Sequence, residues 1–389
     1  MKNLRYILEV ARRELHHWRS HPVSWLGALV TMGFGTVFFV TMFSCKLPSD
    51  LPVGVVDNDR SYISRMFVSQ LNTTPLGEVK QYETFTDARR AMQRGDLTAI
   101  CVIPERFQAD IEAFRQPTFT FYVNSLYFVG GSLSYKNILT MVNLTAGAVQ
   151  KEVLQMKGFT ENAIMGRIKP IAIDTHQIGN PETDYGVYLN AGLLPGFLQM
   201  TVILTLIYAF GSELKDGTAS QVLERAGQKM SNVIMGKLLV YIPYFLLLGY
   251  ALILLLFWGL GYPLKGSLWY MILDVTLLVL ASASVSLFIL ECLPICRFAS
   301  SVGAVYSVLG FSLAGFTLPV EAMLPGIRGL AAIFPLRHYF GMYVQTALFG
   351  SGFAGCWLYI VYLLLFLLLP WTGYRRLRSA YHLQNFPRN

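Results

Sequence analysis

The chain has 389 residues, a length at which a soluble protein would form two or three domains. Its composition excludes that class, because 54% of the residues are hydrophobic and only 14% are charged, whereas a soluble domain carries roughly 25% charged residues. So few charges cannot cover a soluble surface of this size, and much of the chain must therefore lie in lipid. The same composition excludes a disordered or collagen-like chain.

The net charge of +8 belongs to the apolar part of the chain. Between Lys46 and Tyr185, 14 basic residues are balanced by 15 acidic ones, whereas the remainder holds 17 basic and 8 acidic residues. Basic loops beside apolar segments are typical of the cytoplasmic side of a membrane protein. We expect no nucleic acid partner, because no basic face interleaved with aromatic residues occurs.

Six segments are long enough, or nearly so, to cross a bilayer, which needs about 20 apolar residues. The first, 22–44, is too long for the apolar core of a cleaved signal peptide, so we interpret it as a retained anchor. The others are expected near 187–211, 236–260, 268–291, 298–318 and 353–371. Basic residues between spans and in the C-terminal tail place both termini in the cytoplasm of a multi-pass inner-membrane protein.

Residues 4–18 are predicted to form an amphipathic helix along the inner membrane surface. Apolar residues recur at helical spacing, at Leu4, Ile7, Leu8, Ala11, Leu15 and Trp18. The opposite side carries basic residues that can meet anionic headgroups, so membrane lipid is an expected partner.

Residues 45–185 alternate between strand and helix patterns, which predicts a small extracytoplasmic α/β domain with a mostly parallel sheet. Strands are expected at 51–56, 97–103 and 118–123. Helices are expected after Ser61, from Asp87 to Arg94 with Thr86 as the cap, over 107–114, and over about 132–158. Asp57 and Asp59 invite a metal site, but a turn with Asx hydrogen bonds is the stronger interpretation, and we expect no metal.

The predicted fold class is therefore an α-helical membrane protein with six transmembrane helices and an inserted α/β domain that contains a long helix. Its parts are 1–44 (amphipathic helix and first span), 45–185 (extracytoplasmic domain) and 186–389 (spans two to six). Asp274 and Glu291 are carboxylates in or near the spans, and we expect both at an interface within reach of water. That placement disfavours a proton-coupled antiporter.

No nucleotide-binding Gly-x-x-x-x-Gly-Lys-Ser/Thr loop occurs, and neither does a Gly-x-Ser-x-Gly or His-Glu-x-x-His motif. We expect no catalytic residues and no enzyme activity. No cofactor is expected to bind the chain directly, so energy for transport must come from a partner or an ion gradient. Cys292 and Cys296 are interpreted as small buried thiols.

The segment 212–235 combines an acidic residue four positions before the glycine of a Gly-Thr pair with a following apolar pair, and a Gly-Lys directly after it opens the next span. It resembles the cytoplasmic coupling segment of type-2 ABC exporter permeases. The resemblance assigns ATPase coupling to Glu213, Lys215, Gly217, Thr218, Gln221, Val222, Leu223, Gly236 and Lys237. The chain departs from the family pattern at Ser212, Lys215 and Ser220, and the usual proline after the apolar pair is absent.

A second stretch, 312–339, is similar to that family's Gly-x-Thr-x-Pro, Met-Pro and Pro-Leu-x-His pattern. Its residues are Gly315, Thr317, Pro319, Glu321, Met323, Pro325, Pro335 and His338. Prolines break 319–340 too often for one span, and broken backbone survives at membrane depth only inside protein or beside water. We therefore expect a re-entrant helix pair on the outer side, with an interfacial outer loop as the alternative. The outer domain and Asn180-Pro181 resemble the larger members of the family.

The resemblance implies a permease that forms a dimer with a second copy or a paralogue, each half bound to a cytoplasmic ABC ATPase that holds ATP and Mg. Residues 213–223 and the N-terminal helix would form the docking surface. The cargo is expected to be apolar or amphipathic (drug-like, lipid-like or an envelope component). A periplasmic adaptor and an outer-membrane channel are further candidate partners. The alternative is a membrane-anchored sensor or scaffold that binds a ligand or partner through 45–185.

Overall fold

A computed structural model describes residues 2–20, 22–44, 51–72, 77–113, 115–126, 128–156, 158–168, 179–180 and 184–383. Pro181, part of the motif before the second span, lies outside these residues. The chain divides into two compact units, each described by itself. One comprises Met1–Lys46 with His176–Asn389, and the other comprises Leu47–Thr175.

The smaller unit is built on a four-stranded sheet with the order β2-β1-β3-β4. Its strands are β1 (Leu51–Asp57), β2 (Gly77–Gln81), β3 (Ala99–Ile103) and β4 (Thr120–Val123). Strand β1 pairs in parallel with β2 and β3, whereas β4 is antiparallel to β3, which confirms the mostly parallel sheet. The sequence did not reveal β2, because this edge strand is polar and largely exposed.

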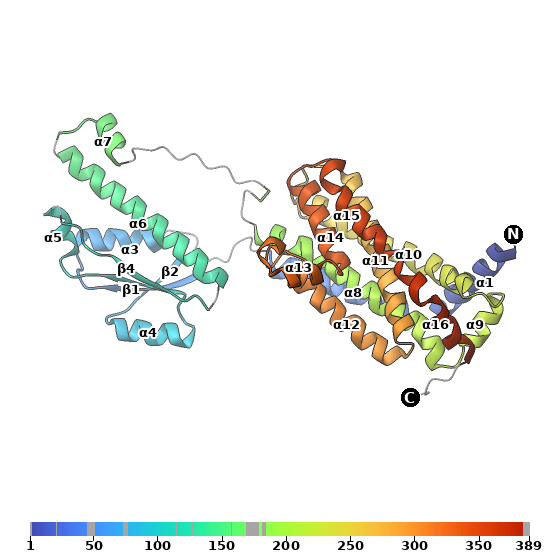
Figure 1. The fold of residues 1–389 in the computed structure, drawn as a ribbon. Helices are drawn as coiled ribbons and strands as arrows, with labels where there is room; N and C mark the ends of the chain where they lie inside the picture. The colour runs from blue at the N-terminus through green and yellow to red at the C-terminus, as the bar shows by residue number, and fades with distance from the viewer. Residues whose placement is uncertain are drawn as a thin grey trace. The chain divides into compact units, whose positions relative to one another are not determined.

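Helices cover both faces of this sheet (Figure 1). They are α3 (Tyr62–Asn72), α4 (Phe85–Arg94), α5 (Phe107–Glu112), α6 (Phe128–Met156) and α7 (Glu161–Ile168). Neighbouring residues of β1 serve opposite faces: Val55 belongs to the apolar cluster with Phe67 and Ile138, and Val56 belongs to the cluster with Ala88. The cap of α4 is Thr84, not Thr86 as predicted, and Thr84 accepts a hydrogen bond from the amide of Asp87.

The turn after β1 has the Asx geometry that the sequence favoured over a metal site. Asp57 Oδ1 accepts hydrogen bonds from the amides of Asp59 (3.0 Å) and Arg60 (2.9 Å), and its Oδ2 accepts one from Ser64 Oγ (2.7 Å). Asp59 Oδ2 accepts from the amide of Gln108 at the start of α5 (3.0 Å). Both carboxylates therefore serve to fix the local backbone.

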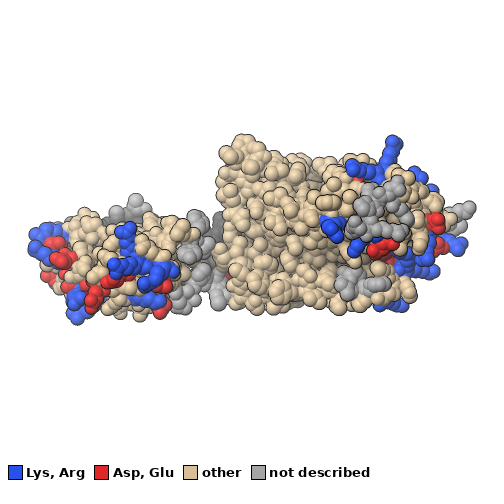
Figure 2. All heavy atoms as spheres, turned by 90° about the horizontal axis from the view of Figure 1, so that it is seen from below, with Lys and Arg blue, Asp and Glu red and all other residues tan. Residues whose placement is uncertain are grey.

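The larger unit contains the six long apolar helices that the sequence predicted, so the predicted fold class is confirmed. They are α2 (Val23–Met42), α8 (Tyr185–Lys215), α10 (Met230–Leu254, extended by the π-helical segment Leu255–Gly259), α11 (Leu268–Cys292), α12 (Cys296–Leu313), and α15 (Phe353–Phe366) followed by α16 (Leu369–Leu383). Helices α8 and α11 are the most buried, so they form the centre of the bundle. In Figure 2 the charged residues of this unit gather at one end, and the rest of the visible face is almost free of charge, as lipid contact requires.

The stretch after α12 folds as short helices instead of a seventh span. They are a 3₁₀ turn (Val320–Ala322), α13 (Pro325–Ala331) and α14 (Pro335–Tyr343), which continues as a π-helical segment (Val344–Leu348). Prolines occupy the first position of α13 and α14, where the missing N–H costs nothing. Tyr188, in the first turn of α8, donates a hydrogen bond to the carbonyl of Phe316. This stretch therefore lies at the end of the bundle where α8 begins.

The N-terminal helix α1 (Lys2–Ser20) is amphipathic, and a stripe that includes a buried acid packs against the bundle. Val10, Ala11 and Glu14 are at most 5% exposed, whereas Leu4 and Leu15 of the predicted apolar face are 63% and 49% exposed. Apolar periodicity does not distinguish a face that meets lipid from a face that meets protein, so the placement of the apolar face along the inner membrane surface stays a prediction.

The predicted interfacial placement of Asp274 and Glu291 is also wrong. Both residues are 0% exposed in the bundle, and none of their carboxylate oxygens has a hydrogen-bond partner among the described residues. The distance of each residue from the ends of α11 can be read from the sequence, but the side chains that pack around it cannot, so this burial could not be predicted.

Candidate coupling site

A cluster of buried charges joins three helices at the end of the bundle where α8 finishes. The ammonium of Lys237 on α10 is surrounded by three oxygens: the carbonyl of Ala209 at 2.7 Å, Glu213 Oε1 at 3.0 Å and Glu14 Oε2 at 3.0 Å. The contacts with Ala209 and Glu213 are hydrogen bonds, whereas Glu14 Oε2 forms an ion pair with the ammonium without a hydrogen bond. The side chain of Lys237 is 1% exposed. One cation therefore ties α10 to both α8 and α1.

Arg13 of α1 completes the cluster through a two-pronged contact with Glu213. Its Nη1 and Nη2 donate to Glu213 Oε1 (2.6 Å) and Oε2 (3.1 Å), a geometry that only a guanidinium provides. Burial lowers the pKa of Arg13, but the hydrogen bond and charge of Glu213 outweigh it, so the pKa lies above its ordinary value. Thr218 also donates to Glu213 Oε2, which links the carboxylate to the Gly-Thr motif.

The four charged groups of this coupling cluster (Arg13, Glu14, Glu213 and Lys237) sum to zero. Glu14 Oε1 accepts a further hydrogen bond from the hydroxyl of Tyr241 (3.1 Å). Burying an isolated charge is costly, but a balanced and hydrogen-bonded set of charges is tolerated. Loss of any one group would leave a net charge buried among the remaining three, so the cluster holds the three helices in one arrangement.

Close backbone packing holds α1 against α10 beside the cluster. A Cβ on Gly236 would lie 2.6 Å from the Cβ of Val10 and 2.9 Å from the carbonyl oxygen of Ile7, so a side chain does not fit. The ring of Trp18 packs edge-on against Tyr241 at 5.0 Å between centroids. The Gly-Lys pair of the motif therefore has two roles, because the glycine permits contact and the lysine supplies the charge.

Between α8 and α10 the chain forms the short helix α9 (Ala219–Arg225). Gly217 precedes it with φ of 72°, a left-handed conformation that favours glycine. Val222 and Leu223 are 0% and 1% exposed, so they pack inward instead of forming an outer surface. The exposed residues of the segment are Lys215, Asp216, Gln221, Glu224, Arg225, Gln228 and Lys229.

This division refines the site predicted from the motif. Glu213, Val222 and Leu223 connect α9 and the turn before it to the bundle, whereas Gly236 and Lys237 hold α10 against α1. A partner protein can reach Lys215 and Gln221. Sequence reasoning missed Arg13, Glu14 and Tyr241. A signal existed for Glu14: it lies three residues after Ala11 and four before Trp18, which places an acid on an apolar face.

The residues of the second motif lie together at the opposite end of the bundle, away from the coupling cluster. Gly315 has φ of 101°, which a glycine adopts without strain. His338 Nε2 donates to the carbonyl of Ala332 at 2.8 Å, and the side chain is 4% exposed. Val320 packs against Gly315, where an added Cβ would lie 3.0 Å from its Cγ2. The motif therefore builds a compact cap, to which Thr317, Pro319, Glu321, Met323, Pro325 and Pro335 also belong.

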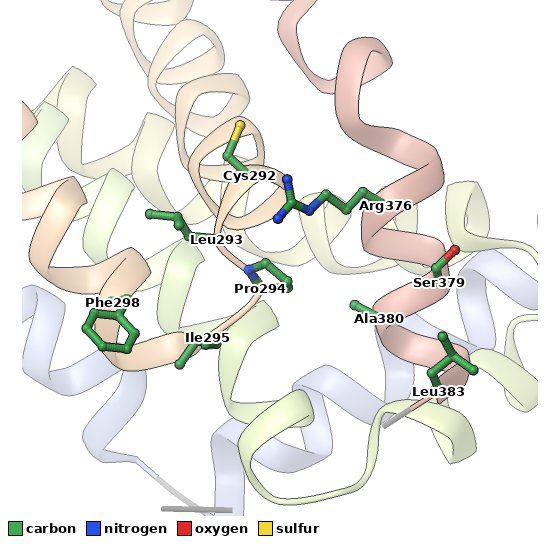
Figure 3. A pocket seen from close by; sticks show the side chains of 9 residues that line it. All are labelled: Cys292, Leu293, Pro294, Ile295, Phe298, Arg376, Ser379, Ala380 and Leu383. Atoms are coloured by element: carbon green, nitrogen blue, oxygen red, sulfur yellow. The ribbon is translucent and has the colours of Figure 1, made fainter. Parts of the chain in front are cut away.

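A pocket of about 320 Å³ opens between the α11–α12 connection and α16 (Figure 3). Its lining is mostly apolar, with Leu293, Ile295 and Phe298 on one side, and the guanidinium of Arg376 extends from α16 towards the end of α11. Cys292 is exposed here and Cys296 is partly exposed, so the expectation of two buried thiols is wrong. The chain turns sharply at Leu293-Pro294, which brings both cysteines to the surface.

Comparison with known proteins agrees with this architecture. Residues 23–373 match the family model described as "ABC-2 family transporter protein". The chain is 22% identical over 364 residues to the inner membrane transport permease YhhJ of Escherichia coli strain K12 and of Shigella flexneri, which covers 92% of both chains. It is also 22% identical over 223 residues to ABC transporter G family member 20 of Dictyostelium discoideum, which covers 57% of this chain but 30% of that protein.

Proposed function

The chain belongs to the ABC-2 family of transporter proteins, and from that premise we propose that it is the membrane subunit of an ATP-driven exporter. Such a subunit is a multi-pass membrane protein whose family membership implies an ABC ATPase partner. ATP and Mg would bind to that partner. The proposed orientation puts both termini and α9 in the cytoplasm of an inner-membrane protein, as the basic residues of the connections favour.

The observation that carries the proposal is the coupling cluster. A force applied to α9 acts through Val222, Leu223 and Thr218 on Glu213, and Glu213 is bound to both Lys237 and Arg13. Packed interiors move as units between discrete arrangements, so α1, α8 and α10 would move together. An anchor for a sensor domain has no need of such a linkage, which disfavours the sensor or scaffold alternative.

The ATPase would dock on the exposed side of α9 and its flanking turns. This face carries charges of both signs, among them Lys215, Glu224 and Arg225, which suits a polar interface that forms and changes during a cycle. The buried residues of the motif then transmit the movement instead of making the contact.

The remaining parts of the proposal concern the assembly and the cargo. We propose a dimer with a second copy or a paralogue. Among the six candidate spans only α8 and α11 are mostly buried within one chain, so a single bundle encloses too little interior to form a translocation pathway. The cargo would be apolar or amphipathic. The unit Leu47–Thr175, placed outside the cytoplasm, has the size of a docking domain for a periplasmic adaptor and an outer-membrane channel.

The test is to co-express the chain with its candidate ATPase, purify the complex and measure both association and permease-dependent ATPase activity. The double replacement Glu224→Lys/Arg225→Glu alters the exposed face of α9 and should abolish co-purification. Lys265→Glu, at the other end of the bundle, is the matched control and should have no effect. Equal co-purification by both variants would contradict docking at α9.

Sidedness needs a separate measurement. A single exposed cysteine at Gln221, in a background with the native cysteines replaced, should react with a membrane-impermeant maleimide only after the cytoplasmic side is opened. Labelling from the outside of intact cells would overturn the proposed orientation and, with it, the role of α9.

A further inference from the structure

A cavity of about 200 Å³ lies beside α13, α14 and α15, within the larger unit. It is at the end of the bundle opposite the coupling cluster. Its polar lining consists of Glu321, Arg328, Arg337, His338, Tyr359 and Tyr362. Two guanidinium groups face one carboxylate, so the cavity carries more positive than negative charge.

Arg337 is the least compensated cation in this cavity. Its side chain is 17% exposed, and its Nη2 lies 3.8 Å from Glu321 Oε1, whose own side chain is 81% exposed. No hydrogen bond from this guanidinium is found within the described part of the chain. A largely buried cation needs a close anion, and a long contact with an exposed carboxylate contributes little. The site therefore lacks a close, buried anionic partner for Arg337.

The neighbouring groups are suited to complete an anion site. Arg328 Nη2 donates to the carbonyl of Glu321 at 2.8 Å, which positions a second guanidinium at the rim. The hydroxyls of Tyr359 and Tyr362 make no hydrogen bond to the residues that the structure describes, so both can donate. The ring of His338 stacks on Tyr362 at 4.7 Å between centroids, and its Nε2 is used by Ala332. His338 therefore shapes the wall but adds no free donor on that nitrogen.

Exposed apolar residues lie on and beside α13, the helix that carries Arg328 of the cavity lining. Leu324, Ile327, Leu330 and Ile333 are between 41% and 75% exposed. The cavity itself is smaller than the roughly 300–1,000 Å³ that encloses a drug-sized molecule, so it fits a headgroup and leaves a hydrocarbon chain outside. A molecule with an anionic head and an apolar tail would satisfy both surfaces at once.

We propose that this cavity binds the phosphate or carboxylate headgroup of an anionic amphiphile, with Arg337 and Arg328 as its ligands. Glu321 then acts as an internal competitor, because its carboxylate lies beside Arg337 where the ligand anion would bind. The inference rests on the proposed function in one respect, namely that such an amphiphile is the cargo. Binding itself depends only on the cavity.

The test measures binding of dodecyl phosphate to the full-length protein in dodecyl maltoside by isothermal titration calorimetry, with inorganic phosphate as the comparison ligand. Charge-assisted hydrogen bonds to a bound anion are strong, so Arg337→Gln should weaken binding of dodecyl phosphate about ten- to hundredfold. Glu321→Gln removes the competitor and should tighten binding several-fold. Lys265→Gln, which removes a charge at the same end of the bundle but outside the cavity, should leave the affinity unchanged.

The opposite signs of the two cavity variants keep the proposal falsifiable, because misfolding cannot tighten binding. Weaker binding by Glu321→Gln, or equal loss by Arg337→Gln and Lys265→Gln, would overturn it. Binding of inorganic phosphate with the same dependence on Arg337 would support the anion site and assign it to a free anion instead of an amphiphile. Co-purification of the ATPase, measured on the same variants, separates the two proposals: it should persist in Arg337→Gln whether or not the cavity binds anions.

Discussion

Lys237 Nζ and Glu14 Oε2 lie 3.0 Å apart, and their side chains are only 1% and 2% exposed. The two residues are far apart in the sequence, yet they belong to one balanced set of charges with Glu213 and Arg13. Buried ion pairs are weak evidence for stability as such, since an apolar replacement of the whole set can be equally stable. Their value here is specificity: the charges are satisfied in a single arrangement of α1, α8 and α10.

Replacing Glu14 by glutamine should destabilise the protein strongly. The substitution keeps the size of the side chain but leaves Lys237 with one carboxylate instead of two, and breaking a buried pair costs about 3–5 kcal/mol. Glu9→Gln is the matched control, because Glu9 lies on the same helix and pairs with Arg5 at the surface. Exposed pairs contribute about 0.2–1 kcal/mol. Denaturant unfolding in detergent measures both variants, and equal midpoints would contradict the structural role of the cluster.

The contact between Gly236 and Val10 predicts a compensating pair of substitutions. Gly236→Ala places a Cβ 2.6 Å from that of Val10, so α1 should move away from α10 and the ion pairs of Glu14 should lengthen. The Cγ1 of Val10 would lie 2.7 Å from the new Cβ at position 236. Val10→Ala removes this methyl group but keeps the Cβ of residue 10. The double variant should therefore recover part of the stability that Gly236→Ala loses. The readout is the thermal unfolding midpoint together with ATPase co-purification. A double variant that is worse than the sum of both single variants would contradict this geometry.

Much of the architecture follows from patterns that are local in the sequence. Apolar length alone identified six spans, short apolar runs ended by turn residues identified β1 and β3, and alternation identified β4, because these signals depend on neighbouring residues. Strand β2 was not predicted, because Glu78 and Lys80 lie on an exposed edge and give no apolar pattern. The sequence could therefore predict elements whose burial is encoded by their own composition.

The candidate site could be predicted only in part, for a related reason. The Gly-Thr and Gly-Lys motifs pointed to Glu213 and Lys237, since both lie in one short segment. Arg13 and Glu14 meet them across 200 residues of chain, and no periodicity in α1 reports which apolar stripe faces protein. Asp274 was misplaced in the same way, because depth along a helix does not reveal what lies around it.

The buried side chain of His338 predicts that the stability of the cap formed by the second motif depends on pH. Burial lowers the pKa of its imidazole, and the nearby charge of Arg337 lowers it further, although the hydrogen bond to Ala332 opposes this. A group with a lowered pKa binds protons more readily when unfolded, so stability is complete above the unfolded value of about 6.5 and declines as the pH falls below it. The protection of the α13 and α14 amides against hydrogen exchange, taken relative to the intrinsic exchange rate at each pH, should fall between pH 7 and pH 5. His338→Gln should remove most of that dependence, and an unchanged profile in the variant would assign it to another group.

The N-terminal cap of α4, in the smaller unit, allows a test of which threonine caps the helix. The structure assigns the cap to Thr84, whereas the sequence predicted Thr86. Thr84 accepts a hydrogen bond from the amide of Asp87 at 3.2 Å and donates one to its Oδ2 at 2.7 Å, a reciprocal capping arrangement. Thr84→Ala should therefore destabilise this unit by about 1 kcal/mol. Thr86→Ala changes an exposed residue within the first turn and should cost at most a few tenths, since alanine is a good helix former. Faster hydrogen exchange of the first turn of α4 in Thr84→Ala alone would confirm Thr84 as the cap. Faster exchange in Thr86→Ala alone would instead assign the cap to Thr86.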